Sequence, residues 1–187
     1  GIPAFKLSKE VVRQRVKQIA DEGVEFRCNA WVGNNVPTSE LNDYDAVLIT
    51  VGSTKARTLN IPGSDLNGIH LAMDFLPQQT RKVLGKDVEH QILATGKNVV
   101  VLGGGDTGSD CIGTSLRQGC KNLVNIELMP KPPLERAKVN PWPEWPMVYR
   151  TSSSHEEGGQ REFSILTKEF VDDGQGNVRA LRVVRVG

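Results

Sequence analysis

The sequence predicts an α/β protein built on a parallel sheet, and three adjacent segments carry that prediction. A β-branched apolar run, Val99–Leu102, leads directly into a glycine-rich turn. A helix pattern follows the turn and ends near Gly119, and a second apolar run, Leu123–Met129, comes next. Strand, glycine turn, helix and strand in this order are typical of the Rossmann-like, doubly wound folds that bind dinucleotides.

The turn has the G-x-G-x-x-G spacing, with glycines at positions 103, 105 and 108. In such a turn the first glycine permits the chain reversal, and the second lets the backbone approach a pyrophosphate. The third lets helix and strand pack closely. Free N–H groups and the positive dipole end of the helix favour an anion. Gly103, Gly105 and Gly108 therefore predict a pyrophosphate site, and a plain βαβ turn without a ligand is the alternative. The Asp106 carboxylate should point away from the phosphate or cap the helix.

Charged residues beyond the second strand are candidates for binding the adenosine ribose. Glu127 lies at the separation from the turn at which an acid accepts the 2′-hydroxyl of NAD, whereas Lys131 and Arg136 suit the 2′-phosphate of NADP. A solvated loop is the alternative for both cations. The proline-rich stretch that follows carries Trp142 and Trp145. We expect this loop to pack onto its own domain, because tryptophans are large apolar groups.

The first part of the chain predicts a helix and two strands. Ser8 is a good N-cap for a helix to about Glu22, and Val24–Val32 and Tyr44–Val51 are strand patterns. The helix should bury a stripe made of Val12, Val16, Ile19 and Ala20. Gly52, directly after the second strand, either offers its backbone to a ligand or is an ordinary strand exit. Residues 54–68 are typical of a connecting segment, which favours a domain boundary near residue 70.

The remaining segments predict a helix and two further strands. One helix or two, starting after Ile69, should cover His70–Gln91 with an interruption at Pro77. The strands are Arg161–Val171 and Val178–Val186, with Phe163, Ile165 and Phe170 facing a core. His155 precedes two glutamates but lacks a second ligand at a fixed spacing, so we predict neither a metal site nor a catalytic side chain.

Composition excludes several classes of function. Lys plus Arg is 23 against 22 Asp plus Glu, and the net charge of +1 gives no reason to expect nucleic acid or a membrane as partner. No stretch predicts a membrane span or a signal peptide. The three cysteines form no C-x-x-C pair, which argues against disulfides, zinc or iron–sulfur ligation within this chain and favours a cytoplasmic location. The chain lacks an initiator Met and stops inside a strand pattern, so we expect a fragment of a longer protein.

Several motifs resemble the small (β) subunit of glutamate synthase, or the equivalent region of the fused enzyme. They are GIPAFKLSKEVV, YDAVLITVGSTKARTLNIPG, GIHLAMDFL, VLGGGDTGSDCIGTSLRQGC and IELMPKPPLERAKVNPWPEWP. The resemblance covers nearly the whole chain, and the motifs together are far more specific than the glycine turn alone.

The resemblance implies a flavoprotein in which an NAD(P)H domain is inserted into an FAD domain. Residues 1–70 would be a partial FAD-binding segment with Gly52 at the flavin, and residues 71–187 the NAD(P)H-binding domain. Gly104, Asp106 and Thr107 would line the pyrophosphate turn together with the motif glycines. Hydride would pass from NAD(P)H to FAD, and electrons would continue through iron–sulfur clusters outside this chain to FMN on the large (α) subunit. There, glutamine and 2-oxoglutarate would yield L-glutamate. The cofactors would supply the hydride chemistry, so no catalytic acid or base is expected here.

The chain also departs from the family pattern. The cysteine-rich region, the first FAD glycine motif and the closing FAD segment are not in this sequence, so we expect the chain alone to be inactive. Many bacterial subunits are arginine-rich where this chain has Glu127–Pro130. A carboxylate there repels a 2′-phosphate and favours NADH, while Lys131 and Arg136 offer a route for NADPH. Two alternatives stay open: a related flavoprotein subunit of the ferredoxin:NAD(P) oxidoreductase or dihydropyrimidine dehydrogenase type, and a nucleotide-binding module without redox activity.

Overall fold

The computed structural model describes residues 2–53 and 55–187, which form two compact units. One unit is Leu7–Ala56, and the other joins residues 2–6 to residues 57–187. Thr54, the first residue of the predicted connecting segment, lies outside the described residues. The assignment of residues 1–70 and 71–187 to a flavin and a nucleotide domain stays a prediction.

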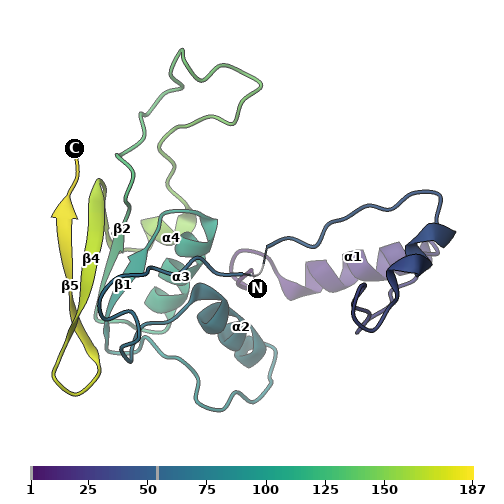
Figure 1. Cartoon of the computed structure of the whole chain (residues 1–187), viewed down its shortest axis with the longest axis horizontal. Helices are drawn as coiled ribbons and strands as arrows, with labels where there is room; N and C mark the ends of the chain where they lie inside the picture. The colour runs from purple at the N-terminus through teal and green to yellow at the C-terminus, as the bar shows by residue number, and fades with distance from the viewer. Residues whose placement is uncertain (1, 54) are drawn as a thin grey trace. The chain divides into compact units, whose positions relative to one another are not determined.

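The larger unit contains the predicted βαβ unit. Strand β1 (Asn98–Leu102) leads through the glycine turn into helix α3 (Asp106–Arg117), which is followed by strand β2 (Asn122–Ile126). Both strands are parallel, and β3 (Gln160–Glu162) adds to β2 in the same direction, giving the order β1-β2-β3. The predicted α/β class with a parallel sheet is confirmed (Figure 1).

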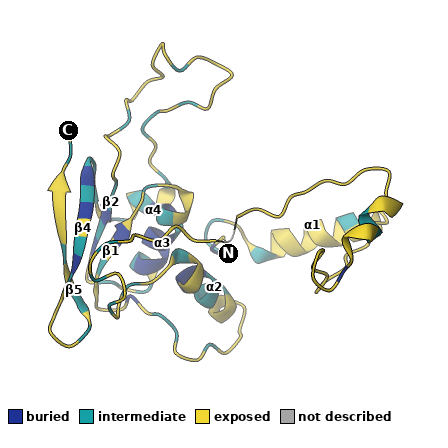
Figure 2. Cartoon of the chain, in the orientation of Figure 1, coloured by how far each residue is buried: buried dark blue, intermediate teal, exposed yellow. Residues whose placement is uncertain are grey.

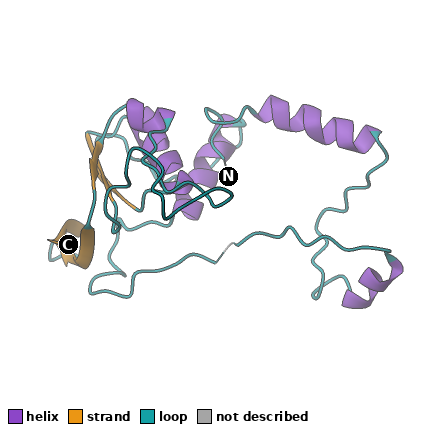
Figure 3. Ribbon diagram, turned by 90° about the horizontal axis from the view of Figure 1, so that it is seen from above, coloured by secondary structure: helices purple, strands orange, loops and turns teal. Residues whose placement is uncertain are grey.

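The core of this unit lies between the sheet and its helices. Ile112 of α3 is fully buried, and Cys111 beside it is also buried. They pack with residues of the strands and of helix α2 (Ala72–Val83), namely Phe75, Leu76, Val101 and Leu123. Figures 1 and 3 show α2 and α3 on the same side of the sheet, and Figure 2 shows buried residues in α3 and also in the C-terminal strand β4 (Ile165–Asp172).

Helix α2 is shorter than predicted and is not interrupted. It ends at Val83 rather than near Gln91, because Gly85 has a φ of +74° and donates its N–H to the Lys82 carbonyl. Pro77 lies inside the helix. A proline removes one backbone hydrogen bond. Here the neighbouring Phe75 and Leu76 anchor the helix in the core, so it continues through the proline.

Strand β1 is less buried than its apolar sequence predicts. Val101 is buried, whereas Val100 is 41% and Leu102 37% exposed. Among the described residues β1 has one neighbouring strand, β2. A strand is covered on both faces only when the elements around it supply both coverings, and in this unit the helices cover one face.

The C-terminal part forms a hairpin, as predicted, but its first strand begins later. Strand β4 (Ile165–Asp172) pairs antiparallel with β5 (Val178–Arg185). Ser164 has a φ of +55° and separates β3 from β4, so the predicted strand Arg161–Val171 is two strands in two sheets. Ile165 and Phe170 are buried, as predicted, and Phe163 is half-buried.

The unit Leu7–Ala56 confirms the predicted helix and contradicts both predicted strands. Helix α1 (Lys9–Asp21) begins after Ser8, whose hydroxyl accepts the N–H of Glu10, and a 3-10 helix η1 spans Thr38–Asp43. The segments 24–32 and 44–51 form no strand in the described residues, and Leu48 is 87% exposed. A buried strand needs neighbours for its backbone and both faces. None of the described residues of this unit supplies them, so the predicted apolar stripe of α1 is also largely exposed.

The proline-rich loop between β2 and helix α4 (Ser153–Glu156) does not pack as predicted. Trp142 is 83% and Trp145 71% exposed. The loop is held by its own polar contacts instead, because the Asn140 side chain bonds the backbone of Trp145 and Met147. Figure 1 shows this segment leaving the sheet after β2 and returning to α4.

Candidate functional site

The glycine turn has the geometry that its spacing predicts. Gly103 has a φ of +104°, a conformation that favours glycine, and donates its N–H to the Ile126 carbonyl at 2.9 Å. A Cβ on Gly108 would overlap the Gly103 carbonyl, so the third glycine is needed for the helix to approach the strand. A Cβ on Gly105 would meet no atom within 4 Å. The second glycine therefore borders open space, as a turn that receives a pyrophosphate should.

Helix α3 begins directly at this open space. Gly105 is its N-cap and provides no side chain to cap the helix, so the first-turn amides keep no side-chain partner there. Asp106 and Thr107 are exposed in the first turn. Asp106 does not cap the helix, which corrects one of the two roles predicted for it.

A buried asparagine that sequence reasoning missed holds the turn from behind. Asn125 of β2 has no exposed surface, and its Nδ2 donates to the carbonyls of Val101 and Gly103 at 3.0 and 2.9 Å. These bonds tie β2 to the end of β1 and to the first glycine. The available signal was a polar residue inside the apolar run NLVNI, because a buried amide requires partners.

Glu127 lies at the turn, but its carboxylate is already paired. A Cβ on Gly104 would overlap that carboxylate, which places Glu127 beside the glycines. Its Oε1 accepts a hydrogen bond from Nη2 of Arg161 at 2.8 Å, and the two side chains are only 16% and 14% exposed. The register of β2 and β3 brings them together, since Asn125 pairs with Arg161. Arg161 was not predicted as a site residue.

The two predicted cations have different positions. Lys131 lies over the Tyr149 ring with its Nζ 4.6 Å from the centroid, and Arg161 lies 4.9 Å from the same centroid. Lys131 and Arg161 thus contact the same ring. Arg136 instead donates to the carbonyls of Asn140 and Glu144 inside the exposed loop. In this conformation it shapes the loop.

A second polar network joins the first turn of α3 to the start of α4. Ser109 of α3 contacts the hydroxyl of Ser152 at 2.5 Å, and that hydroxyl lies 2.8 Å from Nδ1 of His155. The Ser152 N–H also donates to Nδ1, so this nitrogen acts as an acceptor at the start of α4. Burial, assisted by the positive charge of Arg161, lowers the pKa of His155. His155 therefore serves as a helix cap in its neutral form.

This network predicts a pH-dependent stability. Because the folded protein lowers the pKa of His155, the unfolded chain binds its proton more readily, and protonation favours unfolding. We expect the free energy of unfolding to be fully kept above the ordinary pKa of 6.5 and to decrease as the pH falls below it. Urea denaturation across this range should show a smaller decrease in His155→Gln. The control is His70→Gln, at an exposed histidine.

Gly52 does not have the structural setting that the sequence predicts. It has a φ of +67° and is exposed, and the strand that should precede it is not formed. Its proposed flavin contact therefore depends on a strand end that the described residues lack.

Among residues 2–53 and 55–187, no group of three or more histidine, cysteine or acidic side chains could hold a metal ion. In those same residues no helix is both long and apolar enough to cross a membrane.

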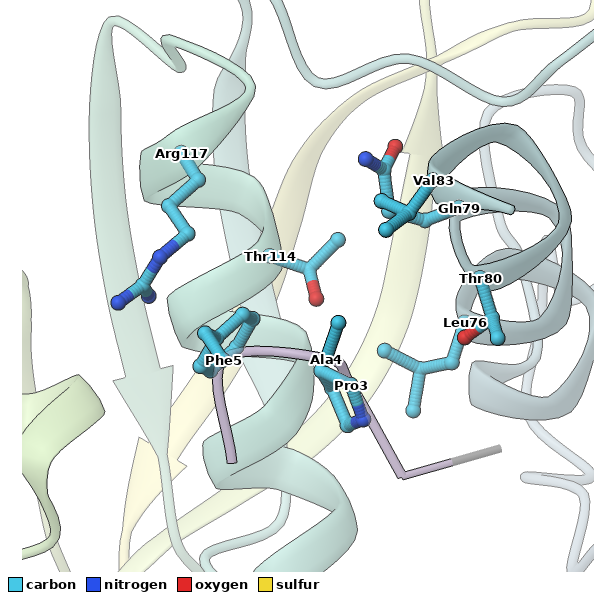
Figure 4. A pocket seen from close by; sticks show the side chains of 9 residues that line it. All are labelled: Pro3, Ala4, Phe5, Leu76, Gln79, Thr80, Val83, Thr114 and Arg117. Atoms are coloured by element: carbon cyan, nitrogen blue, oxygen red, sulfur yellow. The ribbon is translucent and has the colours of Figure 1, made fainter. Parts of the chain in front are cut away.

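The cavity in Figure 4 is separate from the turn. It has a volume of about 140 Å³ and lies between residues 3–5 and the helices α2 and α3. Its walls are mainly apolar, and its α3 residues, Thr114 and Arg117, come from the C-terminal half of the helix. The glycine turn lies at the other end of α3.

In the middle of α3, burial raises the pKa of the Cys111 thiol to about 12, so this cysteine stays protonated at neutral pH.

Comparison with known proteins agrees with the motif resemblance. "Glutamate synthase [NADH]" of Schizosaccharomyces pombe is 48% identical over the whole chain, which covers 9% of that protein. "Glutamate synthase [NADPH] small chain" of Mycobacterium tuberculosis is 46% identical, and that of Bacillus subtilis 38%, with 39% and 40% of their lengths covered. The chain thus spans two fifths or less of these relatives.

The family pattern of pyridine nucleotide-disulphide oxidoreductases matches residues 6–139, which include the glycine turn, Asn125 and Glu127. This match covers most of the chain, and the parallel βαβ unit has the expected arrangement. The chain belongs to the pyridine nucleotide-disulphide oxidoreductase family.

Proposed function

We propose that this chain is the NAD(P)H-binding part of a glutamate synthase. The main observation in support is the geometry at the carboxyl ends of β1 and β2. There a tightly packed glycine turn faces open space, and Glu127 lies beside Gly104. In folds of this kind the pyrophosphate lies on the turn and the ribose near the acid. Three relatives that are 38–48% identical to this chain are named as glutamate synthases or their small chains, and these names support the assignment.

The residues present fit a pyridine nucleotide. Gly103 and Gly105 leave the backbone accessible, Gly104 leaves room for the Glu127 carboxylate, and the amides of Asp106 and Thr107 begin helix α3 at the same point. Gly108 permits the close packing on which the turn depends. When bound, the nucleotide would supply the hydride, and these residues would bind and orient it. No proton transfer is required of the chain.

The rest of the proposed reaction follows from the motif resemblance, and the names of the relatives support its glutamate synthase part. Hydride would pass from NAD(P)H to FAD in a flavin domain that includes residues 1–70 and Gly52, with the nucleotide domain of residues 71–187 inserted in it. Iron–sulfur clusters outside this chain would carry electrons to a large (α) subunit or its fused equivalent. There, glutamine and 2-oxoglutarate would be converted to L-glutamate. We also propose a cytoplasmic location, because the three cysteines form no C-x-x-C pair and are free in the structure.

Reduction of the flavin in the full-length protein tests this function. We expect NADH or NADPH to bleach the flavin absorbance, and glutamine with 2-oxoglutarate to restore it by consuming electrons. Glu127→Arg should shift the preference toward NADPH by about tenfold or more, since a carboxylate is replaced by a cation that can bind the 2′-phosphate. Lys131→Ala and Arg136→Ala test the two other proposed cations.

Two results would contradict the proposal. Nucleotide binding by a full-length protein without flavin absorbance would indicate a non-redox module. Flavin reduction without glutamate formation, in the presence of the large subunit, would indicate a related flavoprotein oxidoreductase with another acceptor.

A further inference from the structure

The Glu127–Arg161 pair changes the charge that a nucleotide meets at the ribose position. A lone carboxylate beside the glycine turn would repel a 2′-phosphate. In the structure, the Glu127 carboxylate contacts the Arg161 guanidinium at 2.8 Å. Both side chains are largely buried, so solvent screens the pair less than it would a surface ion pair. The charge at this position is thus close to balanced.

Besides Glu127, Arg161 is held by neighbours that are not acidic. Its Nη1 donates to the Arg150 carbonyl at 2.9 Å, and its guanidinium lies over the rings of Tyr149 and Phe163. Its Nε is buried and has no hydrogen-bond partner in the described residues. The guanidinium therefore has a fixed position and a spare hydrogen-bond donor, and Glu127 is its ion-pair partner.

A second cation completes this arrangement. Lys131 lies against the same Tyr149 ring that Arg161 contacts, and its side chain is exposed. Two cations and one carboxylate thus lie around the end of β2. This combination can offer a hydroxyl acceptor, Glu127, and phosphate ligands, Arg161 with Lys131.

We propose that Arg161 is a specificity-determining residue for the 2′ position of the adenosine ribose. By pairing with Glu127 it removes the repulsion of a 2′-phosphate, and together with Lys131 it binds that phosphate. Glu127 remains the acceptor for a 2′-hydroxyl. The site consequently accepts both NADH and NADPH, and the balance between them depends on Arg161. This inference rests on the proposed nucleotide site.

Binding of NAD⁺ and NADP⁺ to the full-length protein, measured by calorimetry, tests the proposal. The oxidised nucleotides avoid flavin reduction during the titration. Arg161→Gln should weaken the binding of NADP⁺ by about tenfold or more and that of NAD⁺ by less than about threefold. The freed Glu127 carboxylate repels the 2′-phosphate, which only NADP⁺ carries. Arg161→Lys keeps the charge and should lose less NADP⁺ affinity than Arg161→Gln.

Two further variants separate a specific role from a structural one. Glu127→Gln keeps a hydrogen bond to Arg161 and removes the negative charge, so the NADP⁺ to NAD⁺ preference should rise by about tenfold. This variant keeps the test valid if Arg161→Gln fails to fold. Arg185→Gln breaks a more exposed ion pair, with Glu162 of β3 at 3.2 Å, and should change neither affinity.

The outcomes distinguish this inference from the function on which it rests. Equal weakening of NAD⁺ and NADP⁺ in Arg161→Gln, or an unchanged preference in Glu127→Gln, would show that Arg161 only supports the fold and would overturn the inference alone. Failure of the wild-type protein to bind either nucleotide would overturn the proposed nucleotide site as well.

Discussion

Replacing Gly108 by alanine is expected to destabilise the nucleotide turn and to abolish nucleotide binding. The new Cβ would overlap the Gly103 carbonyl, so α3 could keep its place only if the turn or the helix moved. Moving packed backbone typically costs about 1–3 kcal/mol or more in the free energy of unfolding. Urea denaturation measures this loss, and calorimetry with NADH and NADPH measures the loss of binding.

Gly105→Ala is the matched comparison, because it adds the same methyl group three residues earlier. Gly105 has a φ of −73°, which alanine adopts without strain, and its Cβ would meet no protein atom within 4 Å. The stability should therefore change by less than about 0.5 kcal/mol. The methyl group would occupy the space proposed for the pyrophosphate, so both nucleotides should bind at least about tenfold more weakly, or roughly 1.4 kcal/mol. Unchanged binding by a folded Gly105→Ala protein would contradict the assignment of the turn.

The second large effect is expected for Asn125→Leu. Leucine has a similar volume and cannot donate, so the carbonyls of Val101 and Gly103 would lose the bonds that Asn125 provides. Each buried group left unpaired costs about 1–3 kcal/mol, and we expect a total loss of about 2–4 kcal/mol. Nucleotide affinity should fall too, because Gly103 begins the turn. Denaturation and calorimetry on the same samples give both values.

Asn122→Ala provides the control on the same strand. Asn122 is exposed and bonds the side chain of Asn98 at the start of the ladder. Its loss should cost less than about 0.5 kcal/mol and leave nucleotide affinity unchanged. Equal stability losses in Asn125→Leu and Asn122→Ala would show that the buried amide does not hold the turn.

Elements specified by neighbouring residues could be predicted from the sequence. The order of β1, glycine turn, α3 and β2 follows from a short apolar run, three spaced glycines and a helical pattern that adjoin along the chain. Gly119, with a φ of +77°, ends α3 as predicted, and Ser8 caps α1. Each of these features depends on contacts within a few residues.

Both strands predicted in the unit Leu7–Ala56 are wrong. The segments 24–32 and 44–51 have strand composition, yet they form no strand in the described residues of their unit. Composition expresses a preference for a half-buried pleated surface and does not supply the neighbouring strands. The exposed Trp142 and Trp145 show the same limit, since an apolar side chain is buried only where a complementary surface meets it.

The sequence by itself determined the glycine turn and the presence of an acid after β2, because both are contiguous patterns. The tertiary structure decided what that acid contacts. Glu127 and Arg161 are 34 positions apart, and only the parallel register of β2 with β3 places their side chains 2.8 Å from each other. Asn125 reaches the carbonyls of β1 by the same pairing of strands. Charge balance at the ribose position is therefore a property of the sheet, since it arises where segments distant in the chain meet.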